Sequence, residues 1–153
     1  MNDNGNFVLQ DLNSKNLWET FKNPTDTMLP SQILERGDRL SSRRSETNFS
    51  KGRFQFKLQT DGNLVLTTVN LPTDSANYPY YEIRRGDPGF QVVFNESGYL
   101  YLSSVKGNIF PLTQRVTTPW TTFYHTVTLN FDGVLIQYSY PKNSTENQNW
   151  TAV

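Results

Sequence analysis

The sequence predicts an all-β fold, and three observations lead to this prediction. No long window carries apolar residues at the i, i+3, i+4, i+7 spacing of an amphipathic helix. Thr, Val, Tyr and Phe, which favour strands, dominate the apolar segments. Turn signals containing glycine recur at short intervals, among them Asp61-Gly62, Ser97-Gly98 and Asp132-Gly133. Short strands between regular turns are typical of a β-sandwich, barrel or prism. One helical turn at most is expected, within residues 17–21.

A short pattern occurs four times along the chain. Its glycines are Gly5, Gly62, Gly98 and Gly133, each followed by a stretch of strand-forming residues. The last three glycines are spaced by about 35 residues, which is the length of a unit of three or four short strands. A longer connection separates the first two. Three such units are expected to form sheets that pack around a common axis.

The segment 54–69 predicts a hairpin whose register follows from burial. A two-residue loop at Asp61-Gly62 would mix polar and apolar residues on each face, whereas a three-residue loop, Thr60-Asp61-Gly62, separates them. The second register places Gly62 at the left-handed position of a G1 bulge. The expected inward face is Phe54, Phe56, Leu58, Leu64 and Leu66. The expected outward face is Gln55, Lys57, Gln59, Asn63, Val65 and Thr67.

The other repeats are predicted to keep the same inward face and to differ on the outward face. Expected inward residues are Val92, Phe94, Leu100 and Leu102 in the third repeat, and Val127, Leu129 and Leu135 in the fourth. Expected outward residues of the first repeat are Asn2, Asn6, Val8 and Gln10. The three tryptophans, one in each unit, are expected to pack toward the axis: Trp18, Trp120 and Trp150.

The composition excludes several classes of function. Among the 153 residues, 14 acidic and 14 basic side chains give a net charge of zero, which is unlike a nucleic-acid-binding protein. Arg39, Arg43 and Arg44 are interpreted as a solvated basic cluster. The chain has no cysteine and one histidine, so no disulfide, metal site or cofactor is expected. No apolar run approaches the roughly 20 residues of a membrane span.

Several stretches resemble a known family. The pattern Gln59-x-Asp61-x-Asn63-x-Val65 is similar to the Gln-x-Asp-x-Asn-x-Val-x-Tyr signature of bulb-type, monocot mannose-binding lectins. Residues 17–30, LWETFKNPTDTMLP, resemble a run found in plant S-domain receptor-like kinases, as do residues 80–82, 91–102 and 123–140. The chain therefore resembles a truncated ectodomain fragment of the G-type lectin S-receptor-like serine/threonine kinases.

The resemblance implies a β-prism II fold, with three antiparallel sheets around a pseudo-threefold axis. It implies one bulb-lectin-like domain over residues 1–153, in which 1–40 are the remnant of a first lectin repeat and 41–153 a second lectin-like unit. It also implies an extracellular or secretory location. The first ten residues lack the apolar segment of a signal peptide, so a cytoplasmic location is the alternative in the case of a complete truncated gene product. Four sequons are glycosylation candidates, at Asn48, Asn95, Asn143 and Asn149.

The lectin signature has a chemical rationale. Asp61 would accept hydrogen bonds from two adjacent sugar hydroxyls, while the amides of Gln59 and Asn63 would both donate and accept. Val65 would touch the C–H groups of the sugar. Thr67 stands where the signature has tyrosine, which removes one hydrogen bond of about 0.5–1.5 kcal/mol. Alternatively, these residues serve only the turn. The other three repeats lack the complete triad.

The sequence leaves two alternative non-enzymatic functions. One is binding of mannose-type glycans or glycoproteins; the other is a lectin-like scaffold that has lost sugar binding and serves protein contacts or dimerisation. An enzyme recruited onto the fold is a remote alternative. A catalytic triad needs an oriented base, and the single histidine, His125, is expected to be half-buried because it lies on the same face of its predicted strand as Phe123 and Val127. An open sheet edge in the first repeat predicts a homodimer or a strand-swapped assembly.

Overall fold

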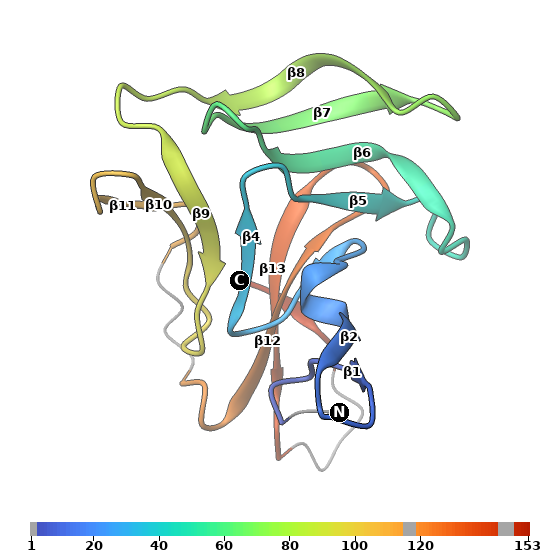
Figure 1. Cartoon of the computed structure of the whole chain (residues 1–153), viewed down its shortest axis with the longest axis vertical. Coiled ribbons are helices and arrows are strands. Elements are labelled where there is room, and N and C mark those ends of the chain that lie inside the picture. Colours follow the sequence, from blue (N-terminus) through green and yellow to red (C-terminus); the bar gives the residue numbers. More distant parts are fainter. Residues whose placement is uncertain (1–2, 115–118, 144–148) are drawn as a thin grey trace.

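Antiparallel β-sheets make up the molecule (Figure 1). The computed structural model describes residues 3–114, 119–143 and 149–153. Within these ranges there are three four-stranded sheets, one two-stranded ribbon and a single 3-10 turn, η1 (Thr20–Lys22). The predicted all-β fold of the β-prism II type is confirmed.

The first sheet has the strand order β5-β6-β7-β8. Its strands are β5 (Arg39–Arg43), β6 (Lys51–Leu58), β7 (Leu64–Asn70) and β8 (Ser75–Ile83). The predicted hairpin register is confirmed, because Leu58 pairs with Leu64. The loop is closed by the N–H of Gln59, which donates to Asn63 O at 2.8 Å, and Gly62 has the expected positive φ of 87°.

The second and third sheets repeat this plan. The second has the order β11-β10-β9-β4, with β4 (Gln32–Glu35), β9 (Gly89–Phe94), β10 (Leu100–Ser104) and β11 (Ile109–Pro111). The third has the order β14-β13-β12-β3, with β3 (Thr27–Met28), β12 (Phe123–Leu129), β13 (Leu135–Pro141) and β14 (Thr151–Ala152). In each sheet, a repeat hairpin occupies the centre and one strand from β3, β4 or β5 lies beside it.

The three strands β3, β4 and β5 are therefore integral to the three sheets. β3 and β4 come from the segment 1–40, while the predicted division between residues 40 and 41 falls inside β5. Met28, Leu34 and Leu40 belong to the same buried cluster as the residues of the later hairpins. The two-part division of the domain stays a prediction.

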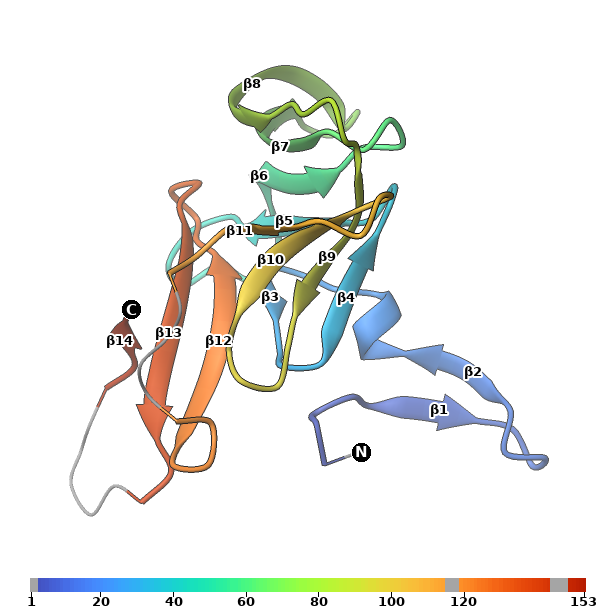
Figure 2. The same ribbon diagram turned by 90° about the vertical axis from the view of Figure 1, so that its left-hand side faces the viewer.

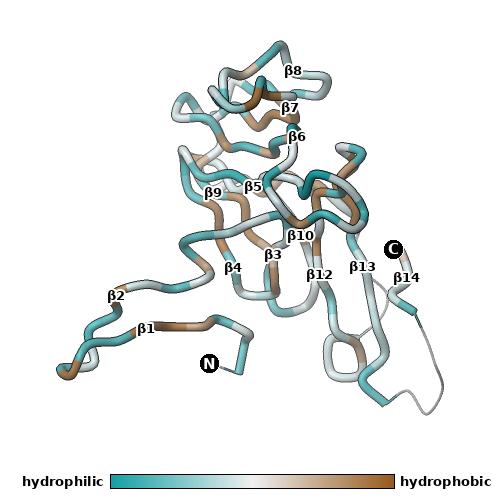
Figure 3. The backbone as a smooth tube through the Cα atoms, turned by 90° about the vertical axis from the view of Figure 1, so that its right-hand side faces the viewer, coloured by the Kyte–Doolittle hydropathy of each residue, from teal (hydrophilic) through white to brown (hydrophobic). Residues whose placement is uncertain are grey.

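The hydrophobic core lies between the inward faces of the three sheets, where Figure 3 shows the hydrophobic stretches of β4, β9, β10 and β12 close together. Burial of the predicted inward residues of these sheets is confirmed; Phe54, Leu66 and Leu135 are partly buried against the cluster. The fully buried residues of the predicted set are Phe56, Leu58, Leu64, Val92, Phe94, Leu100, Leu102, Val127 and Leu129.

The three hairpin tips link the sheets into a closed ring. The carbonyl oxygen of each turn glycine accepts a hydrogen bond from the next sheet. These bonds run from Gly89 N to Gly62 O (3.0 Å), from Gln137 Nε2 to Gly98 O (2.6 Å) and from Tyr80 Oη to Gly133 O (2.6 Å). The first sheet thus contacts the second, the second the third, and the third the first.

The first repeat is organised differently, and the prediction that it keeps a buried inward face is wrong. Gln10 is exposed as expected, while Asn2 lies outside the described residues. Within the described part of the chain, β1 (Val8–Gln10) pairs only with β2 (Asn16–Glu19), in a ribbon that extends away from the sheets (Figure 2). Because no second sheet packs on it, Phe7 and Leu9 are 50% and 52% exposed instead of buried. The reverse holds for Asn6, which was expected to face outward and is buried.

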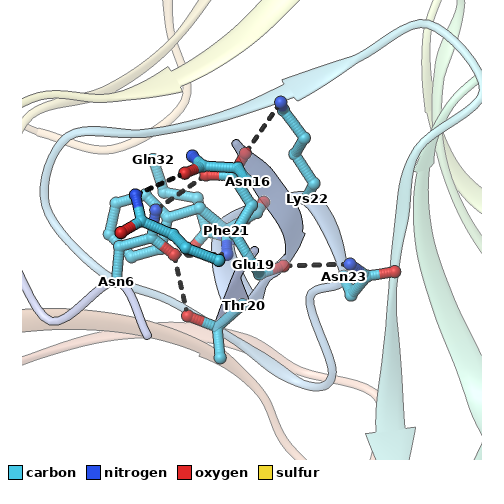
Figure 4. A network of polar contacts seen from close by, with 9 residues as sticks. Asn6, Asn16, Glu19, Thr20, Phe21, Lys22, Asn23 and Gln32 are labelled. Carbon is cyan, nitrogen blue, oxygen red and sulfur yellow. Dashed lines mark hydrogen bonds and ion pairs between the residues drawn. The ribbon is translucent and has the colours of Figure 1, made fainter. Parts of the chain in front are cut away.

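Asn6 joins the ribbon to the turn η1 (Figure 4). Its Nδ2 donates to Glu19 Oε2 at 2.8 Å, and its Oδ1 accepts from Thr20 Oγ1 at 3.0 Å and from Phe21 N at 3.1 Å. Glu19 also pairs with Lys22 at 2.7 Å. The Lys22 ammonium, and then the Asn6 amide, lower the pKa of the Glu19 carboxyl.

The tryptophans do not pack toward the axis, so that expectation is wrong. Trp18, Trp120 and Trp150 are 43%, 52% and 47% exposed. Aliphatic residues and two phenylalanines, Phe56 and Phe94, already fill the buried cluster. Because the interior is close-packed, three indoles would not fit there without displacing these side chains.

Candidate functional site

The β6–β7 hairpin brings together the three polar residues of the predicted site. Asp61 Oδ1 accepts the backbone N–H of Asn63 at 2.9 Å, and Asp61 Oδ2 accepts Asn63 Nδ2, also at 2.9 Å. Gln59 lies opposite Asn63 across the loop. Asp61 is exposed, and Gln59 and Asn63 are half-buried. Each carboxylate oxygen has a second lone pair, so Asp61 can hold the turn and still accept from a ligand hydroxyl.

Val65 and Thr67, which were expected on the exposed outward face, are buried. Both are only 2% exposed, and Gln55 on the same face is buried too, so the solvated outward face ends near Asn63. Thr67 Oγ1 donates to the backbone oxygen of Asn77 in β8 at 2.8 Å. β8 reaches this point through two register shifts against β7, which bend it locally. The assignment of Val65 and Thr67 to a sugar site stays a prediction, which their burial does not support.

The other hairpins show the same turn chemistry without the triad. Asp132 Oδ1 accepts Val134 N at 3.1 Å, which is the counterpart of the bond from Asn63 N to Asp61. In the β9–β10 hairpin, Ser97 precedes the glycine, and the turn is bonded by Asn95, whose Oδ1 accepts Ser97 Oγ at 2.8 Å and Tyr99 N at 2.9 Å. The polar side chains of these turns thus bond the turn itself, and only the hairpin of residues 59–63 carries the complete set of Gln, Asp and Asn.

The glycosylation candidates lie in three settings. Asn48 is exposed, and its Oδ1 accepts from Ser50 N at 3.0 Å and from Ser50 Oγ at 2.6 Å. Asn95 is half-buried in its hairpin. Asn143 and Asn149 are exposed, and the sequon of Asn143 continues into residues outside the described ranges.

His125 is 3% exposed, so it is fully buried where half-burial was expected. A Cβ placed on Gly98 would lie 2.9 Å from its ring, which shows how closely the β9–β10 hairpin packs on β12. Over residues 3–114, 119–143 and 149–153, no group of three or more His, Asp or Glu side chains is arranged to hold a metal ion. In the same ranges, no helix has the length and apolarity to cross a membrane.

Known proteins with similar sequences are plant receptor kinases, although no family model matches the chain. The G-type lectin S-receptor-like serine/threonine-protein kinase LECRK3 of Oryza sativa subsp. indica is 41% identical over 157 residues, covering 100% of this chain and 19% of the relative. The G-type lectin S-receptor-like serine/threonine-protein kinase RLK1 of Arabidopsis thaliana is 46% identical over 123 residues, covering 74% of this chain and 15% of the relative. The chain is homologous to the lectin part of this receptor-kinase family. It spans about a fifth of the length of the curated relatives it matches.

A solved structure supports the same fold for the lectin-like domain. The Japanese Marasmius oreades lectin superposes with a TM-score of 0.56, at 18% identity, over 85% of this chain and 88% of that chain. At this identity the likeness concerns the fold and not the ligand. The three-sheet architecture is therefore shared with a lectin of very different sequence.

The segment with the most specific resemblance to receptor kinases has a structural role in the lectin-like domain. Within residues 17–30, Asp26 O accepts Leu129 N at 2.8 Å, and the hydroxyls of Thr27 and Thr128 lie 2.9 Å apart. The Asp26 carboxylate accepts the Thr27 hydroxyl at 3.1 Å. These contacts attach β3 to β12 and complete the third sheet.

Proposed function

We propose that this lectin-like domain binds mannose-type glycans or glycoproteins, without catalysing a reaction, through Gln59, Asp61 and Asn63. The observation that carries the proposal is the register of the β6–β7 hairpin, which gathers these three hydrogen-bonding side chains at one tip. Homology to kinases named for a G-type lectin supports the ligand class.

The chemistry of the site follows from the atoms on its surface. Asp61 accepts from adjacent hydroxyls of one sugar ring, as carboxylates do when their lone pairs are not all used within the protein. Gln59 and Asn63 supply amide donors beside it. Because Val65 and Thr67 are buried, the sugar is held by polar contacts from three side chains and by little apolar surface. The expected affinity for one monosaccharide is in the millimolar range, about −4 kcal/mol.

Asp61 and Asp132 provide a matched pair of variants for the test. Each precedes a turn glycine with positive φ, and each accepts the backbone N–H two residues later. Asp61→Ala and Asp132→Ala therefore remove equivalent turn bonds, but only the first removes the proposed ligand acceptor. The measurement is calorimetric titration with methyl α-mannoside, a single sugar unit, beside a glycan array.

We expect the wild type and Asp132→Ala to bind mannosides, and Asp61→Ala to lose binding. Equal losses in both variants would show that the turn matters and that Asp61 is not a ligand residue. If neither the wild type nor Asp132→Ala binds any glycan on the array, the mannose proposal is rejected in favour of the scaffold function.

A second candidate function is assembly of two copies through the ribbon. The ribbon carries exposed apolar side chains, among them Phe7, Leu9 and Leu17, and the rings of Phe7 and Trp18 lie 6.4 Å apart. A two-stranded ribbon is marginally stable unless another surface covers it. We propose that a second copy of this chain covers it in a homodimer.

Sedimentation velocity of the wild type, Leu9→Lys and Ile109→Lys tests the homodimer. Leu9 lies in the ribbon and Ile109 in β11, and the two side chains are similarly exposed. The wild type and Ile109→Lys should sediment as dimers, while Leu9→Lys should be monomeric because a charge desolvated at the interface is costly. A monomeric wild type at high protein concentration would refute this assembly.

The extracellular location implied by the homologues also remains a proposal for this chain. The exposed Asn48, in the loop between β5 and β6, is the sequon best placed for a glycan. Expression through the secretory pathway should yield a product whose mass falls on treatment with an N-glycosidase and after Asn48→Gln. An unmodified product would contradict this location for the glycan.

A further inference from the structure

An aromatic cleft at the third sheet lies apart from the polar tip of the β6–β7 hairpin. Its volume is about 610 Å³, and its aromatic lining includes Trp120, Tyr124 and Trp150. This size falls within the range of about 300–1,000 Å³ that is usual for ligand sites. Figure 2 shows its surroundings, where the β9–β10 hairpin and the β3–β4 loop meet the beginning of β12.

The aromatic side chains form a row across neighbouring strands. Tyr124 in β12 pairs with Tyr140 in β13, and the Tyr140 ring lies 5.4 Å from the ring of Trp150, which precedes β14. Trp120 stands beside this row in the segment before β12. Tyr124, Trp120 and Trp150 are each about half-exposed, so parts of their surfaces face the cleft and the solvent.

Polar groups lie among these rings. The Lys142 ammonium is 5.2 Å from the ring centre of Tyr124 and 6.0 Å from that of Trp120. Asn4 and Glu96 also line the cleft, and the Glu96 carboxylate accepts the Ser31 hydroxyl at 3.4 Å. The cleft therefore offers a cationic donor, an amide and a carboxylate acceptor next to exposed π-faces.

This combination matches the surface of a sugar ring. A pyranose has apolar C–H faces that stack on indole and phenol rings, and a rim of hydroxyls that donate to carboxylates and accept from ammonium and amide groups. A nucleic-acid strand is disfavoured, because Asp3 and Glu96 in the same lining would repel its phosphates. An acidic saccharide would meet the same two carboxylates, so a neutral ligand fits best.

We infer that the cleft lined by Trp120, Tyr124 and Trp150 is a second carbohydrate-binding site, which takes a neutral oligosaccharide. The choice of a sugar as the ligand rests on the proposed lectin function, but the site shares no residue with the β6–β7 hairpin. These three aromatic side chains, which extend from the segment before β12 to the segment before β14, favour an extended chain of sugar units over a single monosaccharide.

The test titrates the full chain with three neutral trisaccharides that contain no mannose, cellotriose, maltotriose and triacetylchitotriose. Calorimetry gives the affinity, and tryptophan fluorescence reports on the cleft because two of the three tryptophans line it. The variants are Trp120→Ala, Tyr124→Ala, Trp18→Ala and Asp61→Ala. Trp18 lies in β2 of the ribbon, away from the cleft, and is the matched tryptophan control. Circular dichroism and the melting temperature establish that each variant is folded.

At least one trisaccharide should bind the wild type and shift its tryptophan emission. Trp120→Ala and Tyr124→Ala should each weaken this binding about tenfold or more, as expected when a stacking ring is lost. Trp18→Ala and Asp61→Ala should retain it. This result would stand even if the mannoside titration at Asp61 failed, so the two proposals are tested separately.

Three outcomes would overturn the inference. The first is that none of the trisaccharides binds the wild type at millimolar concentrations. The second is that Asp61→Ala abolishes all trisaccharide binding, which would assign the sugar to the β6–β7 hairpin. The third is that folded Trp120→Ala and Tyr124→Ala both bind as the wild type does, which would leave the rings without a role in recognition.

Discussion

The side-chain amide of Gln137 in β13 donates to the carbonyl oxygen of Gly98, 2.6 Å away in the β9–β10 turn. This one bond joins the second sheet to the third, and Gln137 is buried around it. The carbonyls of Gly62 and Gly133 are held in the same way by Gly89 and Tyr80. The repeated glycine therefore forms a turn within its own sheet and provides an acceptor for the next one.

Replacing Gln137 by leucine should destabilise the protein by about 1–3 kcal/mol, because the Gly98 oxygen loses its side-chain donor in a buried setting. Urea denaturation of the purified domain measures the change. Gln10→Leu in the exposed ribbon is the control, since its amide bonds only the exposed Asn16 side chain at 2.8 Å among the described residues. Equal stabilities for both variants would show that the inter-sheet bond contributes nothing.

Gly98→Ala should destabilise the fold more than Gly107→Ala. Both glycines have positive φ, 76° and 83°, so both substitutions impose a backbone cost of about 1–2 kcal/mol. Only at Gly98 would the new Cβ meet a side chain, the His125 ring at 2.9 Å, whereas nothing lies within 4 Å at Gly107. Overpacking adds about 1–3 kcal/mol at Gly98. Denaturant midpoints of the two variants measure the difference.

Tyr80→Phe should reduce stability by about 0.5–1.5 kcal/mol at neutral pH, because the bond to Gly133 O is lost while the ring keeps its edge contact with Phe54, 6.1 Å between centres. Thermal unfolding monitored by circular dichroism gives the value. A larger loss would mean that the ring had moved, which the near-ultraviolet spectrum would detect.

The same tyrosine should add a pH dependence at alkaline pH. Partial burial, and secondarily the Asp132 carboxylate, raise the pKa of Tyr80 above its usual value of 10.0. The folded state thus retains this proton at a pH where the unfolded chain loses it. The contribution of the protonated Tyr80 to the free energy of unfolding is therefore complete below about pH 10 and is lost as the pH rises through the folded pKa. Between pH 9 and 11, the wild type should lose more stability than Tyr80→Phe; parallel curves would contradict the assignment.

Sequence patterns predict the parts of this structure that local rules determine. The three-residue loop at Gly62 follows from alternation in residues 54–66, because only one register separates apolar from polar side chains. The burial of Thr67 depends on where β8 bends. The exposure of Trp120 and Trp150 depends on which other side chains occupy the core. Such features arise from packing between segments far apart in the chain, which no local periodicity records.

The two candidate sites also differ in how far local sequence determines them. The cluster of Gln59, Asp61 and Asn63 was predictable because one hairpin contains all three residues. The aromatic cleft was not, since its lining comes from the N-terminal segment, the β3–β4 and β9–β10 connections and the third sheet. The pairing of Tyr124 with Tyr140 was accessible in principle from the register of the fourth repeat, in which these two residues are opposite.

Asn6→Ala should release the ribbon without unfolding the sheets. Asn6 bonds Glu19, Thr20 and Phe21, and the hydrogen bonds between β1 and β2 alone make a marginally stable pair. The sheets should persist because their buried cluster contains no residue before Met28. Hydrogen exchange should therefore accelerate in residues 6–22 and remain slow in β6, β9 and β12. Asn13→Ala is the matched control, since Asn13 is an exposed ribbon asparagine whose described hydrogen bond comes from its backbone N–H, which donates to Asp11. Protection of the ribbon unchanged in Asn6→Ala, or lost equally in Asn13→Ala, would show that Asn6 does not anchor it.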